Sequence, residues 1–423
     1  MRAIKIHKSR RVLWLILISS IVYAITLMIH FIYTRYFNPD FRIIIADQVV
    51  FFNRGMGVLQ GRVPYRDFYV NAAPLSSYLW APLVLISMIG SSDYSTNFVN
   101  VENYIDSSSM ILLSYIFRIF FAICIILSAL ILYKLEEKRN NRHAFPIALL
   151  YSINPFFLHL VSFWGSDECI VPLLILLPIY LYERGNKTIA NLVLVLGAGL
   201  KYFPILLAPL IWIYCEKWKE RIIQTIIFFL GLILFVLPLY LLSPSQFLLQ
   251  FQDKILAPGN EGILTIIQEF FSINIESFSF IFPILTILMV GAVGSVLFLR
   301  KRHWSYHQTV ALLMVYLIFF HKMQISYLAM VIPFLYVGFF SKGPIKLLNL
   351  ALFFFGVFEG FFATQLINHS FKRIIWQILS WMEVSIFYIL MIVASIIYTM
   401  KYSKSVTELL YMTETIIIYQ STE

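Results

Sequence analysis

Long apolar runs constrain this chain more than any other feature of its sequence. A helix needs about 20 apolar residues to cross the hydrocarbon core of a bilayer. Runs near this length lie at 12–33, 109–133, 144–162, 169–182, 223–241, 276–299, 345–366 and 378–400. Two stretches, 188–215 and 309–340, are each long enough for a hairpin of two shorter helices. Because a helix satisfies its own backbone in lipid, we predict an all-α polytopic membrane protein of about 12 transmembrane helices.

Composition excludes the soluble classes of protein. Hydrophobic residues make up 60% of the chain and charged residues only 13%, whereas a soluble domain carries about 25% charged residues. Soluble enzymes, nucleic-acid binders and disordered regulators are therefore excluded. The three cysteines, Cys124, Cys169 and Cys215, lie in or beside apolar runs. Their odd number and spacing favour buried core residues over disulfides or a metal site.

Basic clusters predict the orientation of the chain. The net charge is +10, and Lys and Arg gather at 1–11, 134–143, 184–187, 217–221, 300–302, 342–346 and 401–404. One assignment places every cluster in the cytoplasm, together with both termini. This assignment requires that the tips of both hairpins face outward. It also requires that the apolar run at 73–90 does not cross the membrane. We therefore predict a single membrane domain, 1–423, with a long outer loop of interfacial helices at 34–108 and a short cytoplasmic tail at 401–423.

The first outer loop contains a candidate catalytic carboxylate. Ile45, Val49, Phe52, Met56 and Leu59 form an apolar stripe at helical spacing, which suits a helix lying in the membrane interface. Asp47 and Arg54 are seven residues apart and share another face of that helix. This polar face is either simply solvated or holds a general base positioned by an arginine.

Ionisable residues at membrane depth mark further candidates. Arg118, Lys201 and Lys322 would all lie near the outer side, where they either bind an anionic headgroup such as a lipid phosphate or snorkel to the interface. Asp167 and Glu168 precede an apolar run on the same side, either as helix caps or as part of one site with Asp47.

Segments in a fixed order carry a family resemblance. Asp47-Gln48-Val49-Val50-Phe51 is similar to a D-x-D-Y-x-V-F motif, and Gly61-Arg62-Val63-Pro64-Tyr65-Arg66, then Ala73-Pro74-Leu75, to G-x-x-P-Y-x-R and P-L-L-A. Gly165-Ser166-Asp167-Glu168-Cys169 is similar to G-N-A-E-S, Gly199-Leu200-Lys201-Tyr202-Phe203-Pro204 to H-F-K-I-Y-P, and Lys322-Met323-Gln324-Ile325-Ser326-Tyr327 to K-x-x-T-S-Q-Y-F. Over about residues 12–340, the chain resembles the GT-C superfamily of polyprenyl-phosphate-sugar-dependent glycosyltransferases, in particular the catalytic subunit of the first GPI mannosyltransferase and its prokaryotic relatives. It departs from the family at Ile45, where the motif has its first Asp, and at Gln252-Asp253-Lys254, where the family has histidines.

The resemblance implies an inverting transfer of a sugar, mannose by this analogy, from a polyprenyl-phosphate donor such as dolichyl-phosphate-mannose to a lipid-linked or glycan acceptor. Asp47 would be the catalytic base. The substrate-binding residues would be Arg54, Arg62, Tyr65, Arg66, Asp67, Arg118, Asp167, Glu168, Lys201, Lys322, Gln324 and Tyr327. One carboxylate is a poor site for a hard divalent cation, so transfer without a metal is favoured over transfer with a divalent metal, and no cofactor is assigned. The resemblance leaves open whether a small accessory subunit takes part.

Two other classes of function remain as alternatives. A transporter or flippase of a lipid-linked sugar or organic anion would suit many crossings with buried cations, although such proteins commonly show two related halves, and none is visible here. A non-catalytic assembly subunit would not need the carboxylate. The C-terminal residues, 419–423, show no retrieval signal. We therefore expect a prokaryotic cell membrane, archaeal by preference, rather than the endoplasmic reticulum.

Overall fold

The computed structural model describes residues 2–37, 46–70, 72–89, 108–139, 141–256, 284–285, 287–289, 291–292 and 325–339. Within these ranges the chain is helical and forms no strand. The predicted crossings at 345–366 and 378–400, most of 276–299 and the first limb of the 309–340 hairpin lie outside the described residues. The predicted number of crossings therefore stays a prediction.

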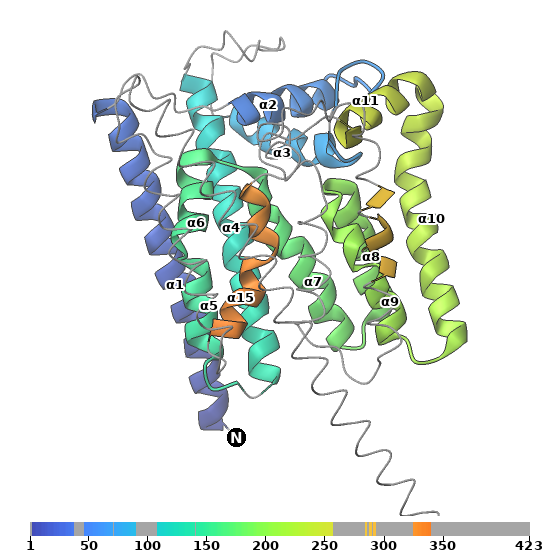
Figure 1. Ribbon diagram of the computed structural model, residues 1–423. Helices are drawn as coiled ribbons and strands as arrows, with labels where there is room; N and C mark the ends of the chain where they lie inside the picture. Colours follow the sequence, from blue (N-terminus) through green and yellow to red (C-terminus); the bar gives the residue numbers. More distant parts are fainter. Residues whose placement is uncertain are drawn as a thin grey trace, which may run out of the picture.

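The described chain forms a bundle of helices with a cap of shorter helices at one end (Figure 1). The long helices are α1 (Arg2–Ile32), α4 (Ser108–Lys138) and α10 (Trp218–Leu242), and the shorter bundle helices are α5 (Ala144–Ser152), α6 (Pro155–His159), α7 (Val171–Glu183), α8 (Lys187–Leu200), α9 (Pro209–Tyr214) and α15 (Ile332–Phe339). The cap contains α2 (Ala46–Leu59), α3 (Ser76–Ile89) and α11 (Pro244–Leu256). Short 3₁₀ turns cover Asp167–Ile170, Phe203–Leu207 and Ile325–Met330.

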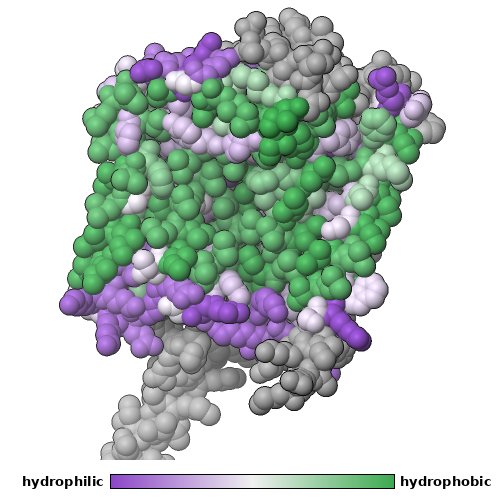
Figure 2. Space-filling model, turned by 180° about the vertical axis from the view of Figure 1, so that it is seen from behind, coloured by the Kyte–Doolittle hydropathy of each residue, from purple (hydrophilic) through white to green (hydrophobic). Residues whose placement is uncertain are grey.

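The length and composition of the helices identify an integral membrane protein. Among the described residues, four segments are long and apolar enough to cross a bilayer: Ser9–Tyr36, Met110–Lys138, Ala144–Trp164 and Trp218–Leu242. The face of the molecule in Figure 2 shows an apolar band, in green, between two hydrophilic margins, in purple. The prediction of an all-α membrane protein is therefore confirmed. The predicted hairpin at 188–215 also forms, and Lys201 lies at its tip between α8 and the turn that leads to α9.

The crossing predicted at 144–162 is not one continuous helix. It breaks after α5, because Pro155 has no N–H to continue the helical hydrogen bonds. Asn154 instead caps α6, and its side chain accepts a hydrogen bond of 2.7 Å from the N–H of Phe156. The Asn154 amide donates to the Tyr336 hydroxyl at 2.8 Å, so the break also fastens α15 to the bundle.

The basic loops described by the structure lie at one end of the bundle. Lys138 and Arg139 at the end of α4 pair with Glu183 at the end of α7. Lys187 pairs with Glu220 at the start of α10, and the N-terminal end of α1 lies at this same end in Figure 1. The cap helices α2 and α3 lie at the opposite end, as expected for a run at 73–90 that does not cross.

The apolar stripe of α2 packs against protein rather than lipid, which corrects the expectation of an interfacial helix with its stripe in the membrane. Val49, Phe52 and Met56 are buried in the main core. A neighbour, Phe51, stacks on Trp80 of α3 with ring centroids 4.4 Å apart. The stripe is buried because α3 and α4 cover it, leaving only its last residue, Leu59, exposed among those described.

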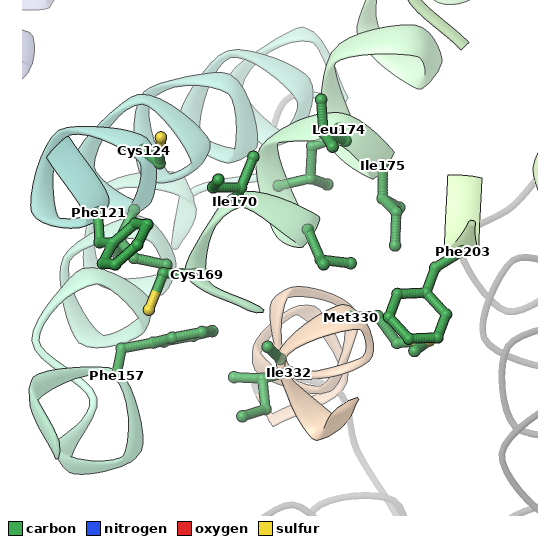
Figure 3. Close-up of a cluster of buried hydrophobic side chains, with 14 of the residues drawn as sticks. Phe121, Cys124, Phe157, Cys169, Ile170, Leu174, Ile175, Phe203, Met330 and Ile332 are labelled. Carbon is green, nitrogen blue, oxygen red and sulfur yellow. The ribbon is translucent and has the colours of Figure 1, made fainter. Parts of the chain in front are cut away.

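Figure 3 shows the part of the main core that lies between α4, α6, α7 and α15. Phe121 and Cys124 come from α4, Phe157 from α6, and Cys169 from the turn before α7. Cys124, Cys169 and Cys215 are all buried and unbonded to one another, which confirms the prediction that they are core residues. The core holds the turn containing Asp167 and Glu168 close to the hairpin tip.

Candidate functional site

Lys201, Asp167 and Glu168 form a part-buried cluster, which we call the ion triad. The Lys201 Nζ lies 2.7 Å from Asp167 Oδ1 and 3.1 Å from Glu168 Oε1. Their side chains keep only 19%, 15% and 9% of their exposure. The Ser166 hydroxyl also hydrogen-bonds Glu168. The sequence left two roles for the acidic residues, as helix caps or as members of a site. In the structure their carboxylates bind the Lys201 ammonium.

Local backbone geometry produces this cluster. Gly165 ends the preceding helical segment in the left-handed region, with φ +62°, where a residue without a Cβ meets no steric cost. Ser166 is extended and starts the short 3₁₀ turn that presents both carboxylates. Lys201 is likewise extended where α8 ends, so its side chain leaves the helix and reaches the same point.

Burial and charge act in opposite directions on the ion triad. Burial raises the pKa of Asp167 to about 6, and the charge of Glu168 adds to that rise while Lys201 opposes it. Burial would lower the pKa of Lys201, but the two carboxylates raise it above its ordinary value. Lys201 therefore stays charged at neutral pH, and Asp167 is the member whose protonation changes closest to neutrality.

The first turn of α2 brings Asp47 into the field of this cluster. Asp47 is exposed, whereas Arg54, two helical turns later, keeps 6% of its exposure. Burial lowers the pKa of Arg54, and the charges of Asp167 and Asp47 act against that effect. The charge of Asp47 in turn raises the pKa of Asp167. Asp47 and Arg54 therefore interact electrostatically with the ion triad through Asp167.

Tyr65 and Tyr202 border this group. Both hydroxyls donate to the carbonyl oxygen of Ala72, at 2.6 and 2.9 Å respectively. Tyr65 is buried and has φ +68°, a strained conformation for a residue with a bulky side chain. Gln250 of α11 holds it there: its amide donates to the Tyr65 carbonyl at 3.0 Å and accepts from the Val70 N–H at 2.7 Å.

Three other residues that the resemblance predicts to bind substrate, Arg62, Arg66 and Asp67, lie in the turn after α2. Arg66 and Asp67 form an exposed ion pair of 2.7 Å, and Asp67 also accepts the N–H of Val63 at 2.7 Å. The hydrogen bond from Arg66, followed by that from Val63, lowers the pKa of Asp67 to about 2. Arg62 is exposed beside them and also lowers that pKa. These side chains stabilise the turn and do not join the ion triad.

The remaining predicted residues have different settings. Arg118 is fully buried in α4. Tyr327 is buried, and its ring lies 4.7 Å from that of Phe203, which follows the hairpin tip. The ring therefore extends the group around the hairpin tip. Lys322 and Gln324 lie outside the described residues.

The sequence reading missed a polar face on α1. Ser19 hydrogen-bonds Ser152 at 2.7 Å, Thr26 accepts from Ser162 at 2.9 Å, and His30 lies 3.1 Å from the Tyr115 hydroxyl. Polar groups of this kind join helices within a membrane. Their spacings of seven and four residues were visible in the sequence and would have predicted one packed face.

Comparison with known proteins adds no family assignment. No protein-family model matches the chain, and no curated protein matches it either. The described ranges contain no group of three or more His, Cys, Asp or Glu side chains placed to hold a metal ion. The Asp167 and Glu168 carboxylates, which could contribute to such a site, bind the Lys201 ammonium. Transfer without a metal stays a prediction.

Proposed function

We propose that this chain is an integral-membrane glycosyltransferase that moves a sugar, mannose by the family resemblance, from a polyprenyl-phosphate donor to a lipid-linked or glycan acceptor. The observation that carries the proposal is the exposed carboxylate of Asp47, which interacts electrostatically with the buried Arg54 and with Asp167, the carboxylate that Lys201 binds. This group lies at the end of the bundle opposite the basic loops. By the positive-inside rule that end faces outward, in a prokaryotic and, by preference, archaeal cell membrane.

The proposed reaction needs a base where an aqueous acceptor meets a lipid-borne donor. Asp47 takes the proton from an acceptor hydroxyl, and the resulting oxygen attacks the anomeric carbon of the sugar. The bond from that carbon to the phosphate oxygen breaks, and its electron pair leaves with the polyprenyl phosphate. Attack opposite the leaving group inverts the anomeric configuration. Asp47 suits the role because its carboxylate is exposed in the first turn of α2.

Phosphate charge that develops in this reaction requires a nearby cation. Lys201 already pairs with two carboxylates, which offset its charge. We therefore assign Arg54 to the leaving phosphate, since it is a buried cation that interacts electrostatically with both Asp47 and Asp167. The ion triad then holds the hairpin tip in place and contacts the polar headgroup.

The decisive test is transfer of radiolabelled mannose from polyprenyl-phosphate-mannose, in membranes that carry wild type or Asp47→Asn. We expect label in lipid-linked products for wild type and none for Asp47→Asn at equal expression. The control is Glu216→Gln, which removes an exposed carboxylate between α9 and α10, at the basic end of the bundle, and should retain transfer. Normal turnover by Asp47→Asn would refute the base. Movement of intact donor across the membrane without transfer would favour the transporter.

A further inference from the structure

Arg118 connects two segments that carry the candidate site. Its Nε donates to the carbonyl oxygen of Ser162 at 3.0 Å, and its Nη2 to that of Phe163 at 3.4 Å. Its Nη1 donates to the side-chain oxygen of Gln48 at 3.3 Å. Gln48 follows Asp47 directly, and Phe163 lies four residues before Asp167. One guanidinium therefore joins the start of α2 to the turn that presents the carboxylates of the ion triad.

Gln48 and Gly165 complete this connection. Ser114, one turn before Arg118 on α4, donates to the Gln48 side-chain oxygen at 2.7 Å and accepts from Arg118. A Cβ at Gly165 would collide with the Gln48 amide nitrogen and lie 3.5 Å from Arg118 Cζ. The turn thus approaches Gln48 more closely than any other residue type would permit. The side chains of Gln48, Ser114 and Arg118 are all buried, so these contacts form away from water.

We infer that Arg118 is a positioning residue that fixes Asp47 relative to the ion triad through Gln48 and the Ser162–Phe163 carbonyls. Its donors point into the protein, toward α2 and the helical segment Leu160–Trp164 that leads into the turn before α7, and its side chain is 0% exposed. This role replaces the donor-phosphate contact that the sequence suggested for Arg118. The inference rests on the proposed function for its kinetic consequence, but its structural consequence can be measured without any substrate.

Loss of a positioning residue should lower turnover rather than donor affinity. A displacement of about 1 Å between a catalytic group and its substrate can cost about 100-fold in rate. We therefore expect Arg118→Gln to lower kcat by roughly 10- to 100-fold with an unchanged donor KM. Arg118→Lys should recover part of the loss, because one ammonium can still reach Gln48 but cannot satisfy both carbonyls as well. A phosphate contact would instead raise the donor KM.

A double-mutant cycle tests the route through Gln48. Gln48→Leu, Arg118→Gln and the double variant should lose kcat non-additively, with the double no worse than Arg118→Gln, since both changes break one connection. The matched control is Arg139→Gln, which removes an arginine paired with Glu183 at the opposite end of the bundle and should leave kcat unchanged. Additive losses, or a raised donor KM in Arg118→Gln, would overturn the inference.

Hydrogen exchange of the full-length chain in lipid nanodiscs tests the same role independently of activity. In Arg118→Gln, amide protection should fall together in peptides covering 46–52 and 160–168, and should stay unchanged at the basic end, 132–138. Gly165→Ala, which leaves Arg118 in place but displaces Gln48, should give the same pattern. A change confined to α4 would overturn the inference. Should the expected pattern appear without any transfer by wild type, the positioning role would stand and the proposed function would fail.

Discussion

Removal of the Lys201 ammonium should destabilise the protein in a way that depends on pH. Lys201→Met preserves much of the side-chain volume but leaves the Asp167 and Glu168 carboxylates side by side. Breaking a buried ion pair by removing one partner costs about 3–5 kcal/mol. Because the three side chains retain 9–19% of their exposure, we expect a loss near the lower end of that range, about 3 kcal/mol at pH 8.

The direction of the pH effect follows from linkage. Without Lys201, burial and mutual repulsion raise the pKa of both carboxyl groups in the folded state above their unfolded values. The folded state then binds more protons than the unfolded state between those values, so stability falls as pH rises through this window. Below the folded pKa both groups are neutral and the penalty largely disappears. We therefore expect Lys201→Met to be far closer to wild type at pH 5 than at pH 8.

Thermal unfolding of purified protein in nanodiscs, at pH 5 and pH 8, measures this difference. The matched control is Lys187→Met, because Lys187 pairs with Glu220 at 3.0 Å but those side chains keep 24% and 33% of their exposure. That pair should be worth less than about 1 kcal/mol. Addition of Asp167→Asn to Lys201→Met should recover stability at pH 8. An equal loss at both pH values, or a loss no larger than that of Lys187→Met, would refute the reasoning.

Two further substitutions test the cap helices. Gly55→Ala should lower the unfolding temperature, since the added Cβ would lie 2.9 Å from the backbone carbon of Trp80. Overpacking of this kind costs about 1–3 kcal/mol. An unchanged unfolding temperature would show that α2 and α3 are less closely packed. Gln250→Leu should expose residues 62–70 to limited proteolysis, because it leaves the buried Tyr65 carbonyl without its partner at a cost of about 1–3 kcal/mol. Wild-type resistance to cleavage would contradict the proposed role of Gln250 in holding that turn.

Several elements of the candidate site were visible in the sequence. Asp47 and Arg54 share a helix, so helical periodicity was enough to predict that they lie near each other. The hairpin that carries Lys201 followed from the length of its apolar run and from the basic residues at both ends. The apolar stripe was also visible in the sequence, but it was expected to lie in the membrane interface and instead packs against protein. A periodic apolar face shows only that something apolar must cover it, and Trp80 and α4 do so here in place of lipid.

The sequence by itself determined the class of protein and, within the described residues, most of its long helices and the grouping of the basic loops at one end, because apolar length, periodicity and charge are local properties of the chain. Only the tertiary structure decided which charges meet. Lys201 binds carboxylates 33 and 34 residues away, and Arg118 reaches Gln48 across 70 residues. Such pairings depend on how the helices pack and where Gly165 turns the chain, and no local pattern records that geometry. Arg118 and Lys201 therefore looked alike as intramembrane cations, although one holds backbone carbonyls and an amide while the other holds two acids.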